Sequence, residues 1–327
     1  MKYLFVSLAT FFAPLVASAH VKWFVDTDAV IASGHGVTPF YSWGSKEVFV
    51  WSAVVLVVVL AFSFIDRWVR TPKRLLAFGF KHEWGINRIS QAVLGVFLVM
   101  ASLVWKVVLV PNLPVQDTIT LILQGAQLII GIMFITNITP RIASMLLVGL
   151  CAGLGIKFGL VMLLENAILL SLAFYFFIVS SKPESFTYTH FYKHAVEIVR
   201  IGTGVSLITL AFTEKLLYPE LGMQFLAVHH WNFMQGLLPW FSDKLFVLST
   251  GFAELIFGVL FIMGYITRIT TVLIAIFFGL SVTTMLIQFK EWEVEDLVVY
   301  SAAILFVFFG HGRTKFFHFG WAKKQVR

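Results

Sequence analysis

Ionisable residues lie inside or at the ends of long apolar stretches of this sequence, where charge is costly. The clearest is Glu254, near the middle of the apolar run from Leu245 to Ile266. A charge within a membrane span costs about 2.5–3.5 kcal/mol on insertion scales and usually faces a protein interior or a watery cavity. Glu254 is therefore a candidate proton-handling group. The alternative is a buried ion pair or hydrogen bond with Lys215, Lys157 or Gln127 that only holds helices together.

The helix that carries Lys215 ends at one face of the membrane. Other polar residues are expected at that face. Glu214 and Lys215 end one apolar run, and they join Glu254 as candidate catalytic residues. An acid at the start of a helix is also favoured by the helix dipole, which is the simpler explanation for the acids that begin other runs. If all these groups converge, they form a polar cavity. Its candidate cofactor-binding residues are Gln127, Glu295 and Asp296, with Glu165 nearby.

The segment from Tyr218 to Asp243 contains two adjacent histidines, His229 and His230, followed by Trp231. The histidines are candidate catalytic residues, and Trp231 is a candidate for binding a cofactor. Neighbouring residues point in different directions on a helix, so the two imidazoles are poorly placed for one metal ion. The alternative is an aromatic lid that lies along the membrane interface.

The N-terminus has the pattern of a secretory signal peptide. Lys2 precedes a short apolar run that ends in Ala17-Ser18-Ala19, which predicts cleavage after Ala19. His20 would then be the new N-terminal residue and would offer its α-amine and a ring nitrogen to a metal ion. With His35 in the same exported segment, these nitrogen ligands suit copper or zinc. The alternative is that His20 follows the cleavage site by chance.

Composition indicates a membrane protein. The 327 residues are 59% hydrophobic and only 13% charged, whereas a soluble domain carries about 25% charged residues. The net charge of +7 comes mostly from residues between apolar runs, so a lipid bilayer is the expected partner and nucleic acid is excluded. The single cysteine, Cys151, rules out a dithiol or a cysteine-ligated iron–sulfur cluster within one chain.

Apolar stretches of about 20 residues are transmembrane candidates. They predict an all-α, polytopic fold with nine membrane-spanning helices. The long run from Ile142 to Ser180 is expected to break near Leu164-Glu165-Asn166 into two helices. The other seven runs are Val48–Ile65, Ile89–Val110, Thr118–Ile138, Ile201–Leu217, Leu245–Ile266, Ile269–Ile287 and Glu295–Gly310.

The distribution of basic residues predicts the topology. If the N-terminus is exported, the inner loops and tail hold 16 of the 24 Lys and Arg residues, including all nine arginines. Cytoplasmic loops carry such an excess of positive charge. We therefore expect a bacterial-type inner-membrane protein with a periplasmic N-terminus and a cytoplasmic C-terminus.

Two parts of the chain read alike. The stretch Gly125 to Gly131 resembles Phe252 to Gly258, and an arginine follows ten residues later in each case, at Arg141 and Arg268. This predicts tandem four-helix units of one orientation, a parallel repeat. The expected organisation is a signal peptide at 1–19, an exported segment at 20–46, a first helix and basic inner loop at 47–85, unit 1 at 86–180, unit 2 at 197–310 and a basic tail at 311–327.

Gly149 and Gly153 lie four residues apart on one helix face. Small residues at this spacing let helices approach closely. We therefore interpret these two glycines as a packing site between helices.

Three stretches of the second unit resemble the DoxX/DoxD-like integral membrane protein family. They are Arg200 to Gly204, Glu214 to Pro219, and Gly251 to Gly258 with Gly264 to Arg268. Glu214 departs from the family, in which a small residue often precedes the lysine. The resemblance implies a quinone-linked or redox-partner membrane subunit whose partners are quinone or a periplasmic redox protein. The alternatives are a carrier or binding protein for a metal ion or small solute, and a non-catalytic scaffold.

Overall fold

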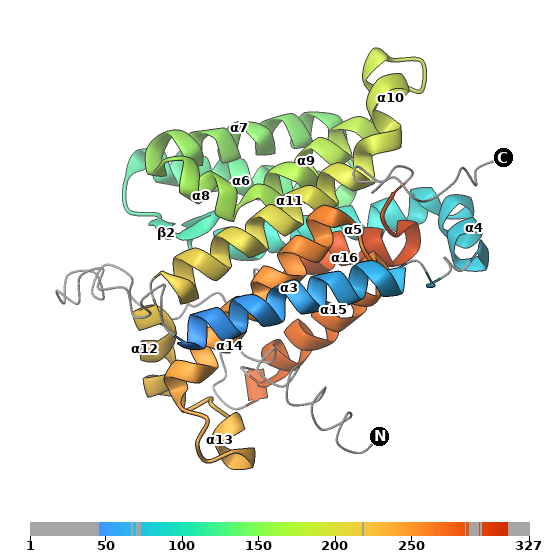
Figure 1. The fold of residues 1–327 in the computed structure, drawn as a ribbon. Coiled ribbons are helices and arrows are strands. Elements are labelled where there is room, and N and C mark those ends of the chain that lie inside the picture. The colour runs from blue at the N-terminus through green and yellow to red at the C-terminus, as the bar shows by residue number, and fades with distance from the viewer. Residues whose placement is uncertain are drawn as a thin grey trace.

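The computed structural model describes residues 46–66, 68–69, 73–217, 219–284, 286–287, 294 and 296–312. Long helices lie side by side along a common direction (Figure 1). α12 (Pro219–His229), α13 (Met234–Leu237) and strand β2 (Val110–Pro114) gather at one end, called here the α12–α13 end. α4 (Lys73–Lys81) and α10 (Phe186–Phe191) lie at the other, the α4–α10 end.

The molecule is helical, and each predicted span contains a helix. Of the described helices, six are long and apolar enough to cross a membrane, so the helical, membrane-like character of the chain is confirmed. Three further apolar stretches, Ala167–Val179, Thr267–Ile276 and Asp296–Phe309, are shorter. The long helices are α3 (Lys46–Asp66), α5 (Glu83–Leu103), α6 (Thr118–Thr136), α7 (Pro140–Phe158), α11 (Ala195–Leu210) with its extension η4 (Ala211–Leu216), and α14 (Asp243–Met263). The rest are α8 (Leu160–Glu165), α9 (Ala167–Val179), η3 (Tyr192–His194), α15 (Thr267–Thr284) and α16 (Asp296–Phe309).

The helix that follows the first basic loop ends earlier than its apolar run. The sequence predicts a span from Ile89 to Val110, but α5 ends at Leu103 and the chain then forms an antiparallel hairpin of β1 (Val107–Val108) and β2. Lys106 and Leu109 adopt left-handed backbone conformations, with φ of 53° and 64°. The Val-rich sequence suits a strand as well as a helix, which is why apolarity alone misplaced this boundary.

Local polar chemistry sets several helix ends. Asp117 caps α6 by accepting a hydrogen bond from the backbone N–H of Thr120, whose hydroxyl in turn accepts from the Asp117 N–H. Ser242 caps α14 by accepting a hydrogen bond from the Leu245 N–H. At the other ends, Asn137 and Gly264 are left-handed C-caps of α6 and α14, a conformation that ends a helix by satisfying its last carbonyls.

Two helix pairs cross at facing glycines. A Cβ on Gly95 of α5 would lie 2.7 Å from the carbonyl oxygen of Gly131 on α6. A Cβ on Gly204 of α11 would lie 2.6 Å from the carbonyl oxygen of Gly258 on α14. No side chain fits at either crossing, so the backbones touch directly.

The interpretation of Gly149 and Gly153 as packing residues is wrong. A Cβ at either position would meet nothing within 4 Å, and both residues are exposed on α7. The spacing of small residues identifies a common face but not what lies against it.

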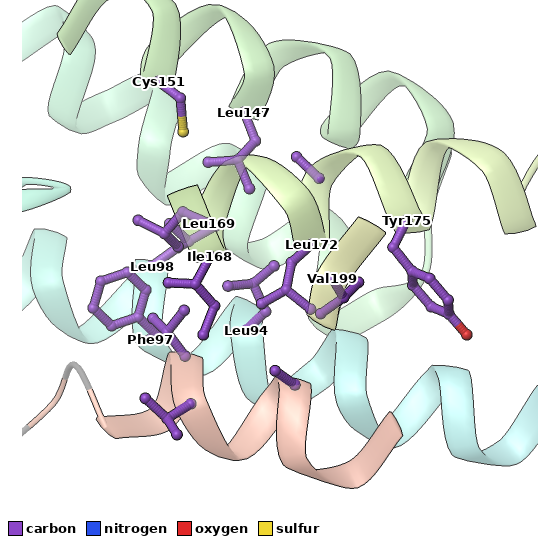
Figure 2. Packing of buried hydrophobic residues seen from close by; sticks show 14 of the residues in the cluster. Leu94, Phe97, Leu98, Leu147, Cys151, Ile168, Leu169, Leu172, Tyr175 and Val199 are labelled. Carbon is purple, nitrogen blue, oxygen red and sulfur yellow. The ribbon is translucent and has the colours of Figure 1, made fainter. Parts of the chain in front are cut away.

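The main core is shared by the two halves of the chain. Figure 2 shows Leu94 of α5 beside Leu172 of α9 and Val199 of α11. α5 packs along α16, and α11 packs along α9, so the first helix of each half lies against the last helix of the other. Hydrogen bonds reinforce the α5–α16 contact, because the hydroxyls of Ser90 and Ser301 each donate to the other's backbone carbonyl.

Candidate functional site

A buried lysine lies against two carboxylates near the α12–α13 end. Lys215 Nζ is 2.9 Å from Glu254 Oε1 and 3.7 Å from Glu214 Oε2. The Lys215 side chain is 3% exposed, that of Glu214 is 1% exposed and that of Glu254 is 10% exposed. Lys215 is one of the partners that the sequence allowed for Glu254, and the structure brings all three candidate catalytic groups of this cluster together.

A wide helical turn presents two of these groups. α11 continues beyond Leu210 as η4, a π-helical segment that carries Glu214 and Lys215. Both side chains are buried although they are adjacent in sequence. Single π-helical turns inside α-helices are rare and occur frequently at functional sites.

Two hollows lie near this ion cluster, and only the smaller one is lined by one of its charged residues. One is an apolar groove of about 500 Å³ between α3, η4 and α14. The other, of about 240 Å³, lies under α12 and has Lys215 among its lining residues. Consecutive residues thus reach different hollows, because Leu216 lines the groove while Lys215 lines the smaller pocket. The remaining groove residues are Val48, Ser52, Phe212, Leu248, Phe252 and Leu255.

The histidine-bearing segment forms a packed cover over the pocket. Phe225 of α12 contacts both the Trp231 ring, at a centroid distance of 5.9 Å, and the His229 ring, at 4.5 Å. Trp231 is buried, whereas His230 is exposed with a left-handed φ of 49°. Phe225 and Leu226 line the pocket, and neither histidine is among its lining residues.

Gln127 occupies a different setting from Glu254, although the two residues correspond in the repeated sequence motif. Its side-chain oxygen accepts a hydrogen bond from the Leu109 N–H at 2.7 Å, and its amide nitrogen donates to the Ser102 hydroxyl at 3.0 Å. Gln127 is fully buried and braces the β1–β2 hairpin. Lys106, which like Lys215 precedes a proline-containing loop in its half of the chain, is exposed.

Of the remaining candidates, Asp296 is buried in the first turn of α16, as expected for an acid near a helix N-terminus. Glu165 was expected to open a helix but is instead the last residue of α8, and α9 begins at Ala167. Glu295, His20 and His35 lie outside the described residues. Within the part of the chain that the structure describes, no three His, Cys, Asp or Glu side chains gather as a metal site.

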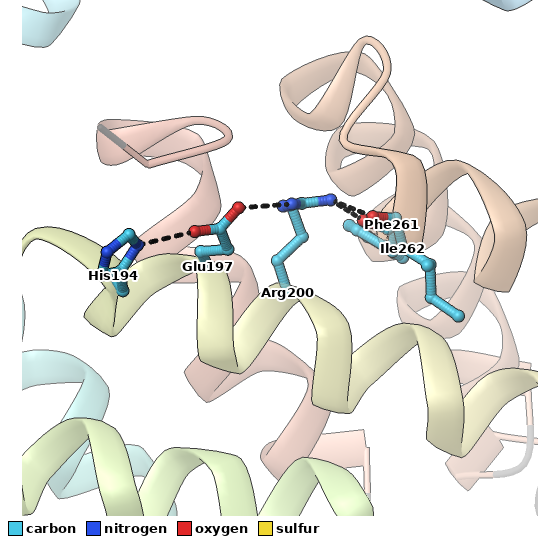
Figure 3. Close-up of polar contacts among 5 residues, drawn as sticks. All are labelled: His194, Glu197, Arg200, Phe261 and Ile262. Carbon is cyan, nitrogen blue, oxygen red and sulfur yellow. Dashed lines mark hydrogen bonds and ion pairs between the residues drawn. The ribbon is translucent and has the colours of Figure 1, made fainter. Parts of the chain in front are cut away.

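A second row of polar side chains, buried at Glu197 and Arg200 and half-buried at His194, was not predicted from the sequence. Figure 3 shows His194, Glu197 and Arg200 in a row on one face of the α11 region. Glu197 lies 3.0 Å from His194 Nδ1 and 3.4 Å from Arg200 Nη2. Arg200 donates to the carbonyl oxygens of Phe261 and Ile262, the latter at 2.7 Å.

This row of side chains ties α11 to the C-terminal end of α14. Its sequence signal was the spacing of Glu197 and Arg200, three residues apart, which places them on one helix face. In the first half, Gln91 of α5 donates to the Phe134 carbonyl of α6 at 3.0 Å in the corresponding place.

No protein-family model matches the chain. No curated protein matches it. No solved structure matches it either.

Proposed function

We propose that this chain is a DoxX/DoxD-like inner-membrane protein that acts as a quinone-linked or redox-partner subunit. The proposal depends on the buried Lys215–Glu254–Glu214 cluster and on the apolar groove that is lined by Leu216 and Leu255, the sequence neighbours of Lys215 and Glu254. The resemblance of the second unit to that family supports the same assignment. Because the chain has one cysteine and hence no dithiol of its own, its electrons come from a partner protein.

The groove suits the apolar part of a quinone. Ligand sites are mostly apolar with a few placed polar groups, and six of the seven groove residues are apolar. α3 forms one wall, and most of its surface is exposed, as expected of a helix in contact with lipid. A lipid-soluble ligand reaches the groove from the bilayer without crossing water.

The ion cluster supplies the polar chemistry. A lysine ammonium donates hydrogen bonds to a quinone carbonyl, and carboxylates accept or release the protons that accompany quinone reduction. Glu254 and Glu214 fill this role in the proposal, and Lys215, which lines the pocket under α12, is the donor. His229 and Trp231 belong to the cover over the neighbouring pocket.

We also propose that the chain has nine membrane spans and that eight of them form two tandem four-helix units. Both halves cross their first two helices at facing glycines. Both then turn through two left-handed residues at matching places, Asn137 and Thr139 in one half and Gly264 and Ile266 in the other. Quinone-site chemistry is assigned to the second half alone, since Gln127 holds a hairpin where Glu254 meets Lys215.

The test is the quinone content of the full-length protein purified in mild detergent, measured by mass spectrometry. We expect bound quinone in the wild type. Ser52→Trp fills the groove from α3, and Lys215→Met removes the donor, so both lose quinone. Val57→Trp places the same indole on an exposed position of α3 and keeps it.

Lys157→Met is the matched control for the lysine, because Lys157 is exposed at the end of α7. Quinone absent from the wild type, or equal in all variants, would refute the proposal. Stoichiometric copper or zinc in the same samples, lost on His20→Ala, would favour the alternative of a metal carrier.

A further inference from the structure

A third hollow, a narrow cleft, opens at the α4–α10 end of the molecule. It shares no lining residue with the two hollows beside Lys215. Helices of both halves form its walls. The apolar part of its lining includes Phe80, Val179, Val196 and Phe309, and its polar part comprises Glu83, Tyr175, Tyr192 and Lys193.

The polar walls of this cleft offer mainly hydrogen-bond acceptors. The Tyr192 hydroxyl donates its proton to Glu83, and the Tyr175 hydroxyl donates to Asn87 at 2.6 Å. A phenol has one proton to donate but two lone pairs, and a carboxylate has about four acceptor sites. A ligand must therefore bring the donors. Lys193, which is exposed, supplies a cation at the edge.

The surroundings of the cleft resemble a membrane interface. Trp84 is 74% exposed, and Phe80 is 40% exposed beside the cleft. Aromatic rings concentrate at the level of lipid headgroups. α4 also carries Arg74 and Lys81, which suit a surface that faces lipid phosphates.

We infer that this cleft binds a phospholipid whose headgroup carries a primary ammonium next to a phosphate, that is, an ethanolamine phospholipid. The ammonium donates to Glu83 and to the phenol oxygens of Tyr175 and Tyr192. The phosphate lies at Lys193, and the lipid chains follow Phe80 and Phe309. A choline headgroup has no N–H donor. A phosphoglycerol headgroup has hydroxyl donors but no cation to pair with the Glu83 carboxylate, so only the ethanolamine headgroup supplies both.

The experiment uses the full-length chain, delipidated in detergent and titrated with ethanolamine, choline and glycerol phospholipids of identical acyl chains, with native mass spectrometry as the readout. We expect preferential retention of the ethanolamine lipid. Glu83→Gln should weaken it about tenfold, as expected for the loss of a charge-assisted hydrogen bond. Glu184→Gln, an exposed acid at the same end, should change nothing.

Equal retention of the three lipids by the wild type would overturn the inference. So would a Glu83→Gln protein that binds like Glu184→Gln, or competition by free phosphoethanolamine as strong as that by the lipid. Tyr192→Phe provides a second variant if Glu83→Gln does not elute as a monodisperse species. It removes the phenol that holds the Glu83 carboxylate and should also lower the preference for ethanolamine.

Discussion

Lys215 and Glu254 stabilise each other's charge in a setting where neither could remain charged alone at low cost. Taking an ion out of water costs several kcal/mol, and the attraction of a close partner offsets that cost only while both are present. The two groups are 2.9 Å apart, so the charged state of each residue depends on the presence of the other. The adjacent Glu214 adds a second negative charge to the cluster.

Removing one partner of the Lys215–Glu254 pair should lower the free energy of unfolding more than removing both. We expect Lys215→Met to lower the free energy of unfolding by about 3 kcal/mol or more, because it removes an ammonium group that lies against two buried carboxylates. Lys215→Met combined with Glu254→Gln should recover part of that loss. The free energies of unfolding of the single and double variants can be measured in mixed micelles of mild detergent and dodecyl sulfate. Strictly additive effects would contradict the pairing, and Lys157→Met should stay within about 0.5 kcal/mol of wild type.

At the scale of elements, the glycine crossings require the absence of a side chain. Gly204→Ala places a Cβ 2.6 Å from the Gly258 carbonyl oxygen and should destabilise the protein by about 1–3 kcal/mol through overpacking. Gly149→Ala meets open space and should be neutral or slightly stabilising, since alanine is the better helix former. The same unfolding assay compares them, and equal effects would argue against direct backbone contact between α11 and α14.

The start of α6 should respond to acid. The backbone and side-chain hydrogen bonds from Thr120 lower the pKa of the Asp117 carboxyl below its usual value. A lowered folded-state pKa contributes stability above the normal aspartate range, and this contribution is lost as pH falls through the lowered pKa. Hydrogen exchange at the Thr120 amide should therefore be faster in Asp117→Ala than in wild type at neutral pH. The difference should vanish in strong acid, and a difference that persists there would contradict the cap.

For the whole molecule, the proposed orientation puts the α12–α13 end in the periplasm. Gln224→Cys on α12 should react with a membrane-impermeant maleimide in intact cells. Glu184→Cys, near the other end, should react only after the cells are broken. The chain without an added cysteine should not react with the maleimide, because Cys151 is fully buried. The reverse pattern of labelling would invert the topology and remove the exported site.

The sequence predicted the helices well because apolar length is a strong signal, and it predicted less well what lies between them. The hairpin after α5 depends on left-handed conformations at Lys106 and Leu109, and neither is a glycine or asparagine that would announce a turn. Gly149 and Gly153 had the right spacing for packing but no neighbour. Boundaries and helix faces are decided by tertiary contacts that a local pattern does not contain.

The candidate sites also differ in how far the sequence could predict them. Lys215 and Glu254 could be singled out because charged residues are rare in apolar runs. Few residues were therefore candidates for an ion pair with Glu254. The contact of Glu83 with Tyr192 joins residues 109 positions apart, and both lie in segments where polar residues are common. No spacing rule links them. The same limit applies to the helix faces that line the groove, which only the packing of α3 against α14 defines.

The exchange of partners between the halves has a practical consequence. Because α5 lies along α16 and α11 lies along α9, the covalent link near Glu184 contributes little to holding the two parts together. A protease cut there should leave a complex that still migrates as one species, and the two fragments expressed from separate genes should find each other in the bilayer. Such a split chain would allow each half to be labelled with isotopes or altered independently.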